Sequence, residues 1–100
     1  MTVLEKMPRA FDPRSMPTET LNELAIKLNE DIINLQRLYD VNFDKWCKIP
    51  YYAPDEETNA AQTACKNTRI NITKAYNKRF KLRNELSARE REELRYLTTQ

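Results

Sequence analysis

The residues of this chain that could do chemistry are its carboxylates, its two cysteines and its many lysines and arginines. The acid pairs Glu30-Asp31 and Glu92-Glu93 are adjacent in sequence, and we expect them to be solvated rather than to form an acid–base dyad. The chain has no histidine, so its serines and threonines lack the commonest general base. We therefore expect no catalytic residues and do not expect an enzyme.

The same residue inventory argues against metals and cofactors. Cys47 and Cys65 do not form a CxxC pair and have no histidine companions, which excludes an ordinary zinc site. We expect them to be buried free thiols, with a disulfide across a hairpin as the alternative. The chain has no glycine, so every glycine-rich nucleotide-binding loop is excluded. We expect no cofactor.

Composition and length predict one small all-α domain. The 100 residues are 40% hydrophobic and 32% charged, which is typical of a globular rather than a disordered chain. A helical chain of this size has little room for both a core and an enclosed cleft. The absence of glycine also counts against a sheet with several tight hairpins.

Apolar periodicity predicts a first long helix over about 18–47. Pro17 fits its first turn, and Glu19 and Glu23 suit the positive end of its dipole. Its apolar seam falls within about 60° of one direction and comprises Leu21, Leu24, Ala25, Leu28, Ile32, Leu35, Tyr39, Phe43 and Trp46.

A second long helix is predicted over about 54–85, after a loop that contains Pro50, Tyr51, Tyr52 and Pro54. Its small residues Ala61, Ala64 and Cys65 should face the Phe43–Trp46 end of the first helix, as an antiparallel hairpin requires. The rest of its inward face is Thr68, Ile72, Ala75, Tyr76, Leu82 and Leu86.

Both ends of the chain depart from the hairpin. Residues 87–90 match a capping box, S-x-x-E, and predict a short third helix over 88–98 with Leu94 and Leu97 inward. The alternative is a second helix that continues through this point. Prolines prevent a continuous helix in residues 1–17 and predict an extended arm. The predicted fold is thus an all-α antiparallel helical hairpin (18–100) with a short C-terminal helix and an irregular proline-containing N-terminal arm (1–17).

Several apolar residues are left over once the hairpin seam is assigned. Ile26 and Ile33 lie one heptad apart and away from the main seam, and Ile70 and Phe80 point away from the inward face of the second helix. They could form a second apolar surface or simple surface scatter. The loop tyrosines could bind a partner or cover the end of the hairpin. The partner-binding candidates are Phe11, Pro13, Ile26, Ile33, Pro50, Tyr51, Tyr52, Ile70 and Phe80.

Positive charge is concentrated in the second helix, because residues 58–84 carry seven basic side chains and no acid. The pattern indicates either a stripe for phosphates or an acidic protein, or a solvated face that pairs with the acidic first helix. Arg79 falls inside the apolar stripe, so we expect it to pair with Asp31 or Glu23, or else to meet a partner. The basic-surface candidates are Lys66, Lys74, Lys78, Lys81 and Arg83.

Three segments carry a general resemblance to known proteins: the MPRAFDPRSMP arm, the IPYYAP loop and the NITKAYNKRFKLR helix. With them the chain resembles small phage-encoded proteins that redirect host machines, and among these the lambdoid-phage anti-RecBCD recombination proteins. The resemblance implies an inhibitor that alters the host RecBCD nuclease–helicase through protein contact in the host cytoplasm. It transfers no site residues.

The sequence therefore supports three hypotheses of function. The first is a non-enzymatic protein that binds and modulates a host protein; the second is a nucleic-acid-binding protein that uses the basic second helix; the third is a homo-oligomeric assembly protein. The prolines make a prolyl isomerase a further candidate partner.

No apolar run approaches the ~18–20 residues that span a bilayer, and the N-terminus lacks an apolar signal region. We therefore expect a cytoplasmic protein without membrane contact.

Overall fold

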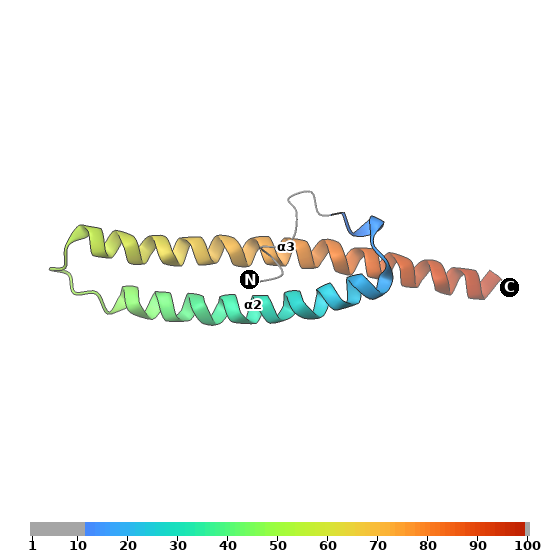
Figure 1. Cartoon of the computed structure of the whole chain (residues 1–100), viewed down its shortest axis with the longest axis horizontal. Helices are drawn as coiled ribbons and strands as arrows, with labels where there is room; N and C mark the ends of the chain where they lie inside the picture. The colour runs from blue at the N-terminus through green and yellow to red at the C-terminus, as the bar shows by residue number, and fades with distance from the viewer. Residues whose placement is uncertain (1–11, 100) are drawn as a thin grey trace.

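The computed structural model describes residues 12–99 and confirms the all-α antiparallel hairpin (Figure 1). A short 3-10 helix, η1 (Pro13–Ser15), precedes two long helices, α2 (Thr18–Cys47) and α3 (Asp55–Thr99). Residues 1–11, which include the candidate Phe11, lie outside the described residues. The part of the predicted arm that is described, from Asp12 on, is irregular apart from the turn of η1.

Helix α2 has the bounds that its apolar periodicity predicts. Pro17 stands at its N-cap in extended conformation, and its carbonyl accepts a hydrogen bond from the Leu21 amide at 3.1 Å. Glu19 lies in the first turn and Lys45 in the last, so both charges complement the helix dipole. The helix ends at Cys47, just before Pro50 would make its continuation costly.

Helix α3 begins after Pro54, whose carbonyl accepts hydrogen bonds from the amides of Glu57 and Thr58. The three acids of the segment 55–57 lie in its first turn, where the dipole stabilises negative charge. From there the helix runs without interruption for 45 residues.

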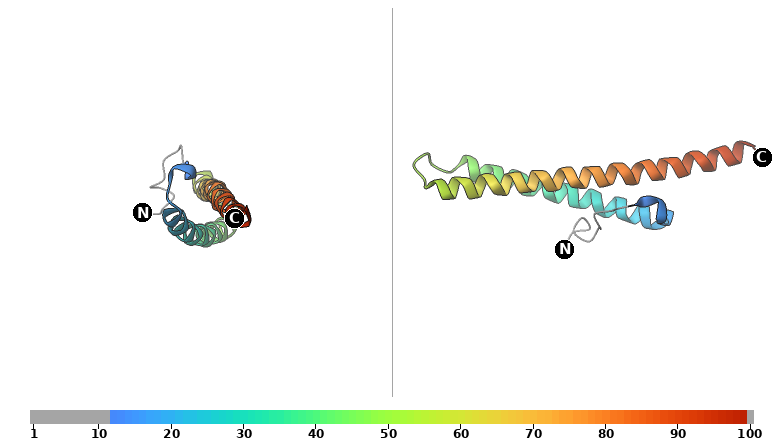
Figure 2. Two further views of the ribbon diagram at one scale, coloured as in Figure 1. Left: turned by 90° about the vertical axis from the view of Figure 1, so that its right-hand side faces the viewer. Right: turned by 90° about the horizontal axis from the view of Figure 1, so that it is seen from above.

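The two helices pack antiparallel along one thin seam. Side-chain hydrogen bonds step forward along α2 while they step back along α3, and they join Asn29 to Arg79, Gln36 to Tyr76 and Asn42 to Thr68. The predicted inward positions form two small core clusters, built on Leu21 with Leu82 and on Leu28, Ile32 and Ala75. Seen from above, the helices cross one another (Figure 2).

The predicted third helix does not form as a separate element, because α3 continues through Ser87 to Thr99. A capping box acts only where the chain enters a helix from another conformation. Residues 83–90 contain neither proline nor glycine to interrupt the preceding helix. A continuous helix also keeps every backbone hydrogen bond of the region. The alternative of an unbroken second helix is therefore the one that the structure adopts.

The end of α3 projects beyond the body of the hairpin (Figure 1). Arg89 is level with Thr18, the first residue of α2, and residues 90–98 are all exposed. Leu94 and Leu97, expected to face inward, are therefore 55% and 60% exposed, since α2 does not extend far enough to cover them. The molecule measures 73 × 22 × 16 Å. Within residues 12–99, neither long helix has the run of apolar residues that a membrane crossing requires.

Candidate functional site

Within residues 12–99, no group of three or more cysteine, aspartate or glutamate side chains is placed to hold a metal ion. Both cysteines are free thiols. Cys65 is buried as expected, but Cys47 is exposed, because it ends α2 beside the loop. Asp31 was expected to be solvated, but it is buried, with 8% of its surface exposed.

The first candidate surface lies on the side of α2 that points away from α3. Ile26, Ile33 and Val41 are exposed by 62%, 48% and 50%. At 100° per residue they span an arc of about 80° around the helix. The opposite side of the helix carries the core residues Leu28 and Ile32. We call these three side chains the apolar outer face of α2.

The loop between the helices presents two tyrosines to solvent. Tyr51 is 100% exposed and Tyr52 77%, and their rings meet edge to face with centroids 5.5 Å apart. A turn in which the Ala53 amide donates to the Pro50 carbonyl at 3.0 Å holds the loop. The exposure excludes the alternative in which these tyrosines cover the end of the hairpin.

Ile70 and Phe80 do not join Ile26 and Ile33 in one apolar surface. Both are exposed, by 43% and 67%. Since the core residues of each helix face the other helix, Ile70 on the far side of α3 points away from Ile26 and Ile33 on the far side of α2. The predicted second apolar surface is thus divided between opposite sides of the hairpin.

The second candidate surface is the far side of α3, where Lys66, Lys74 and Lys81 are exposed and Lys78 is half-buried. We call these four side chains the lysine face of α3. Arg83 is also exposed, but at 100° per residue it lies on another side of the helix. Burial, followed by repulsion from Lys74 and Lys81, lowers the pKa of Lys78 below the ordinary lysine value.

The basic residues of α3 do not pair with the acids of α2. The ion pairs between residues 12 and 99 join Arg14 to Asp12, Lys48 to Asp44 and Arg89 to Glu85, and none of them uses a basic residue of the range 58–84. The alternative of a solvated face neutralised by the first helix is therefore not what the structure shows.

Arg79, the basic residue inside the apolar stripe, has an internal partner of another kind than expected. It donates to the Asn29 side-chain oxygen at 3.0 Å, and its guanidinium lies 4.7 Å from the centre of the Tyr76 ring. The partner is thus an amide and an aromatic face instead of the carboxylate of Asp31 or Glu23. A neutral acceptor is sufficient because Arg79 is only half-buried.

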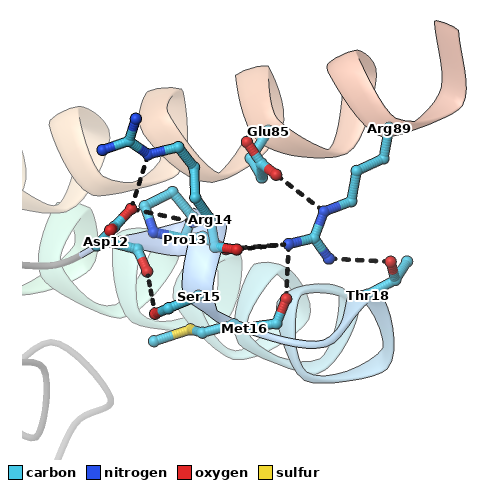
Figure 3. A network of polar contacts seen from close by, with 8 residues as sticks. All are labelled: Asp12, Pro13, Arg14, Ser15, Met16, Thr18, Glu85 and Arg89. Atoms are coloured by element: carbon cyan, nitrogen blue, oxygen red, sulfur yellow. Dashed lines mark hydrogen bonds and ion pairs between the residues drawn. The ribbon is translucent and has the colours of Figure 1, made fainter. Parts of the chain in front are cut away.

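Arg89 connects residues 13–18 to α3 through hydrogen bonds (Figure 3). This role was not predicted from the sequence. The Arg89 guanidinium donates to the Glu85 carboxylate at 2.9 Å and to the Thr18 hydroxyl at 3.0 Å. One terminal nitrogen also reaches the carbonyls of Met16 at 2.6 Å, Pro13 at 3.2 Å and Arg14 at 3.4 Å. A planar fork of five donors suits several acceptors at once. We call this network the Arg89 clasp.

The clasp changes the interpretation of Pro13, which was a partner-binding candidate. Pro13 is buried in η1, and the Arg89 clasp holds its carbonyl, so it serves internal packing. Asp12 caps η1 by accepting from the Arg14 amide at 3.1 Å. This bond and the Arg14 side chain lower the pKa of Asp12.

A shallow groove between the helices, near the loop, was also not predicted from the sequence. Its volume is about 370 Å³, and it is lined by Tyr39, Trp46, Gln62, Cys65, Lys66 and Arg69. Of the small α3 residues predicted to face this end of α2, Cys65 lines the groove opposite Tyr39 and Trp46. Lys66 links the groove to the lysine face.

Comparisons of the chain with protein-family models, with curated proteins and with solved structures found no match.

Proposed function

We propose that this protein is a non-enzymatic binding protein that attaches to a host protein through the apolar outer face of α2, with the exposed tyrosine loop as a second contact. The observation that carries the proposal is an imbalance between core and surface in the described residues. Six hydrophobic residues are buried, two of them alanine or cysteine, whereas thirteen large hydrophobic residues are exposed. Apolar area of this extent outside a core is typical of interaction surfaces.

The simplicity of the packing supports the same conclusion. Within residues 12–99, each long helix packs mainly against the other, so most of the circumference of each helix remains in contact with water. A second protein packed on the hairpin would bury apolar side chains that two helices alone leave in water.

The resemblance to phage anti-RecBCD proteins narrows the proposed partner. We propose that the partner is a host nucleic-acid-processing enzyme, with RecBCD as the first one to examine. The protein would act by contact and by altering the partner's activity.

The proposal is tested by measuring binding of the full chain to purified RecBCD, together with the nuclease and helicase rates of the complex. The test variant carries Ile26→Gln, Ile33→Gln and Val41→Gln, which remove apolar area without changing charge or helix propensity much. The matched control carries Thr20→Gln, Asn22→Gln and Asn34→Gln, at exposed polar positions of the same helix.

We expect the wild type and the control to bind and to change the enzyme's rates, and the test variant to bind at least tenfold more weakly. If the wild type leaves RecBCD unbound, that partner is wrong, and affinity capture from bacterial lysate with the same three proteins becomes the test. A captured protein that the test variant retains as well as the control would overturn the role of the apolar outer face.

Self-association is the competing explanation of the exposed apolar area. Light scattering of the purified chain at high concentration separates the two. A stable dimer whose formation is abolished by the three glutamine substitutions would assign the apolar outer face to a second copy of the chain instead of a host protein.

A further inference from the structure

The lysine face of α3 is an unusually long surface without negative charge. Residues 58–84 contain no acid, and the four lysines from Lys66 to Lys81 span an arc of about 120° around α3 along roughly 22 Å of helix. Lys74, Lys78 and Lys81 follow each other at intervals of about one helical turn. Three positive side chains thus follow one another along one side of α3.

Within residues 12–99, no ion pair neutralises these charges. As described above, the ion pairs of residues 12–99 lie elsewhere. The direction of the Lys78 pKa shift agrees with this, because repulsion from Lys74 and Lys81 adds to the effect of burial. A row of lysines without acidic partners attracts a polyanion.

The side chains around the lysines favour phosphate over an acidic protein. Most of the exposed neighbours on this side are uncharged hydrogen-bonding groups, Thr63, Asn67, Thr73, Asn77 and Asn84. Lysine, threonine and asparagine are ordinary phosphate-contacting residues, whereas the centres of protein interfaces are depleted in lysine and enriched in aromatic residues. Ile70 is the large apolar residue among them.

The same composition favours a duplex over a single strand. Single strands are bound on aromatic side chains that stack with successive bases. Within this stretch of α3, Phe80 and Tyr76 are the aromatic residues, and Tyr76 is engaged with Arg79 and Gln36. A straight row of ammonium groups contacts backbone phosphates without reading bases.

We propose that the lysine face of α3 binds the phosphate backbone of a nucleic-acid duplex, without sequence preference, at a site separate from the apolar outer face of α2. The inference goes beyond the proposed function: it gives the molecule a second, oppositely placed surface. A protein held on an enzyme by α2 would thereby also contact that enzyme's nucleic-acid substrate through α3.

The experiment is fluorescence anisotropy of labelled 25-base-pair duplex DNA, duplex RNA and a single strand of equal length, titrated with the full chain at ~50 mM and ~200 mM salt. The test variant carries Lys66→Gln, Lys74→Gln, Lys78→Gln and Lys81→Gln. The matched control removes the same charge elsewhere, through Lys27→Gln, Arg37→Gln, Lys45→Gln and Arg91→Gln, all at exposed positions.

About four phosphate contacts predict that affinity for the duplexes falls roughly 100-fold between the two salt concentrations. We expect the test variant to lose at least tenfold in affinity and most of the salt dependence, and the control to stay within about threefold. Tighter binding of one duplex type would show whether the lysine face of α3 prefers DNA or RNA.

Three results would overturn the proposal: no duplex binding at ~50 mM salt, equal losses in the test and control variants, or binding of the single strand alone. Capture of an acidic protein through the four lysines, without duplex binding, would assign the face to that protein class instead. The variant with Ile26, Ile33 and Val41 changed to glutamine retains all lysines, so it should bind the duplex like the wild type. Its duplex binding therefore tests the lysine face independently of the proposed protein contact of α2.

Discussion

Arg89 joins three parts of the chain at the open end of the hairpin. Two helices joined by one loop tend to separate at the end away from the loop, and the apolar packing there is the small cluster around Leu21 and Leu82. There Arg89 bonds to α3 through Glu85 and to the segment 13–18 through a hydroxyl and three carbonyls. Removing the guanidinium would leave these acceptors to water or to no partner.

We predict that Arg89→Ala lowers the free energy of unfolding by about 1–3 kcal/mol, measured by urea denaturation followed by circular dichroism. The Arg89 side chain is a quarter exposed, so water replaces part of what is lost. Arg89→Lys should recover only part of the stability, because lysine has no planar fork. Arg91→Ala, at an exposed position of the same helix, is the control, and an equal loss in both alanine variants would contradict the clasp.

Lys78 should make the stability of the fold depend on pH. Its pKa in the folded chain lies below the ordinary value of 10.5, so the folded state binds this proton more weakly than the unfolded state does. The charged form of Lys78 therefore opposes folding at neutral pH. This destabilisation of the folded state disappears as pH rises from the pKa of Lys78 in the folded chain towards 10.5.

We predict that Lys74→Gln raises the pKa of Lys78, because one like charge next to it is removed. The measurement is an NMR titration of the Lys78 side chain. Lys66→Gln is the control, since twelve residues of helix place it about 18 Å away. A Lys78 pKa of 10.5 or above, or an equal rise in both variants, would show that the lysines do not sense each other.

At the scale of elements, the unequal lengths of the helices decide what is buried. α2 has 30 residues and α3 has 45, so α2 does not reach the last part of α3. Leu94 and Leu97 are consequently exposed although their spacing is that of a core stripe. A stripe predicts which side of a helix is apolar, whereas the length of its neighbour determines whether that side is covered.

We predict that a chain ending at residue 90 keeps the stability of the full chain within about 0.5 kcal/mol, because residues 91–98 are exposed. Its helical signal should fall by the share of the deleted turns. A chain ending at residue 80 removes Leu82, Leu86 and Arg89 and should unfold. A loss above about 1 kcal/mol in the first truncation would mean that the end of α3 packs on the body.

The whole molecule is a rod. Its radius of gyration is 19.0 Å, compared with about 13 Å for a compact domain of 100 residues. A rod has much surface for its volume, so its core is a single thin line of side chains. Its opposite sides are correspondingly separate, which places the apolar outer face of α2 and the lysine face of α3 on different sides of one rigid hairpin. The two proposed partners could be bound together.

Much of this architecture was predictable from the sequence because it depends on local rules. The bounds of α2 follow from Pro17, Pro50 and a 3.6-residue apolar period, and the start of α3 follows from Pro54 and three acids. The lysine face follows from charge counting and helix geometry alone. These features are determined within a few helical turns, so the residues that cause them are neighbours in the chain.

What only the tertiary structure decided concerns residues far apart in sequence. Arg89 meets Met16 across 73 positions, and Arg79 meets Asn29 across 50. No local pattern distinguishes an arginine that collects distant carbonyls from one that points to solvent. The capping box at Ser87 was misleading for the same reason, since its effect depends on whether the chain already runs as a helix there. Local periodicity determined the helices, and the register between them determined which side chains are held, which are covered and which remain open to a partner.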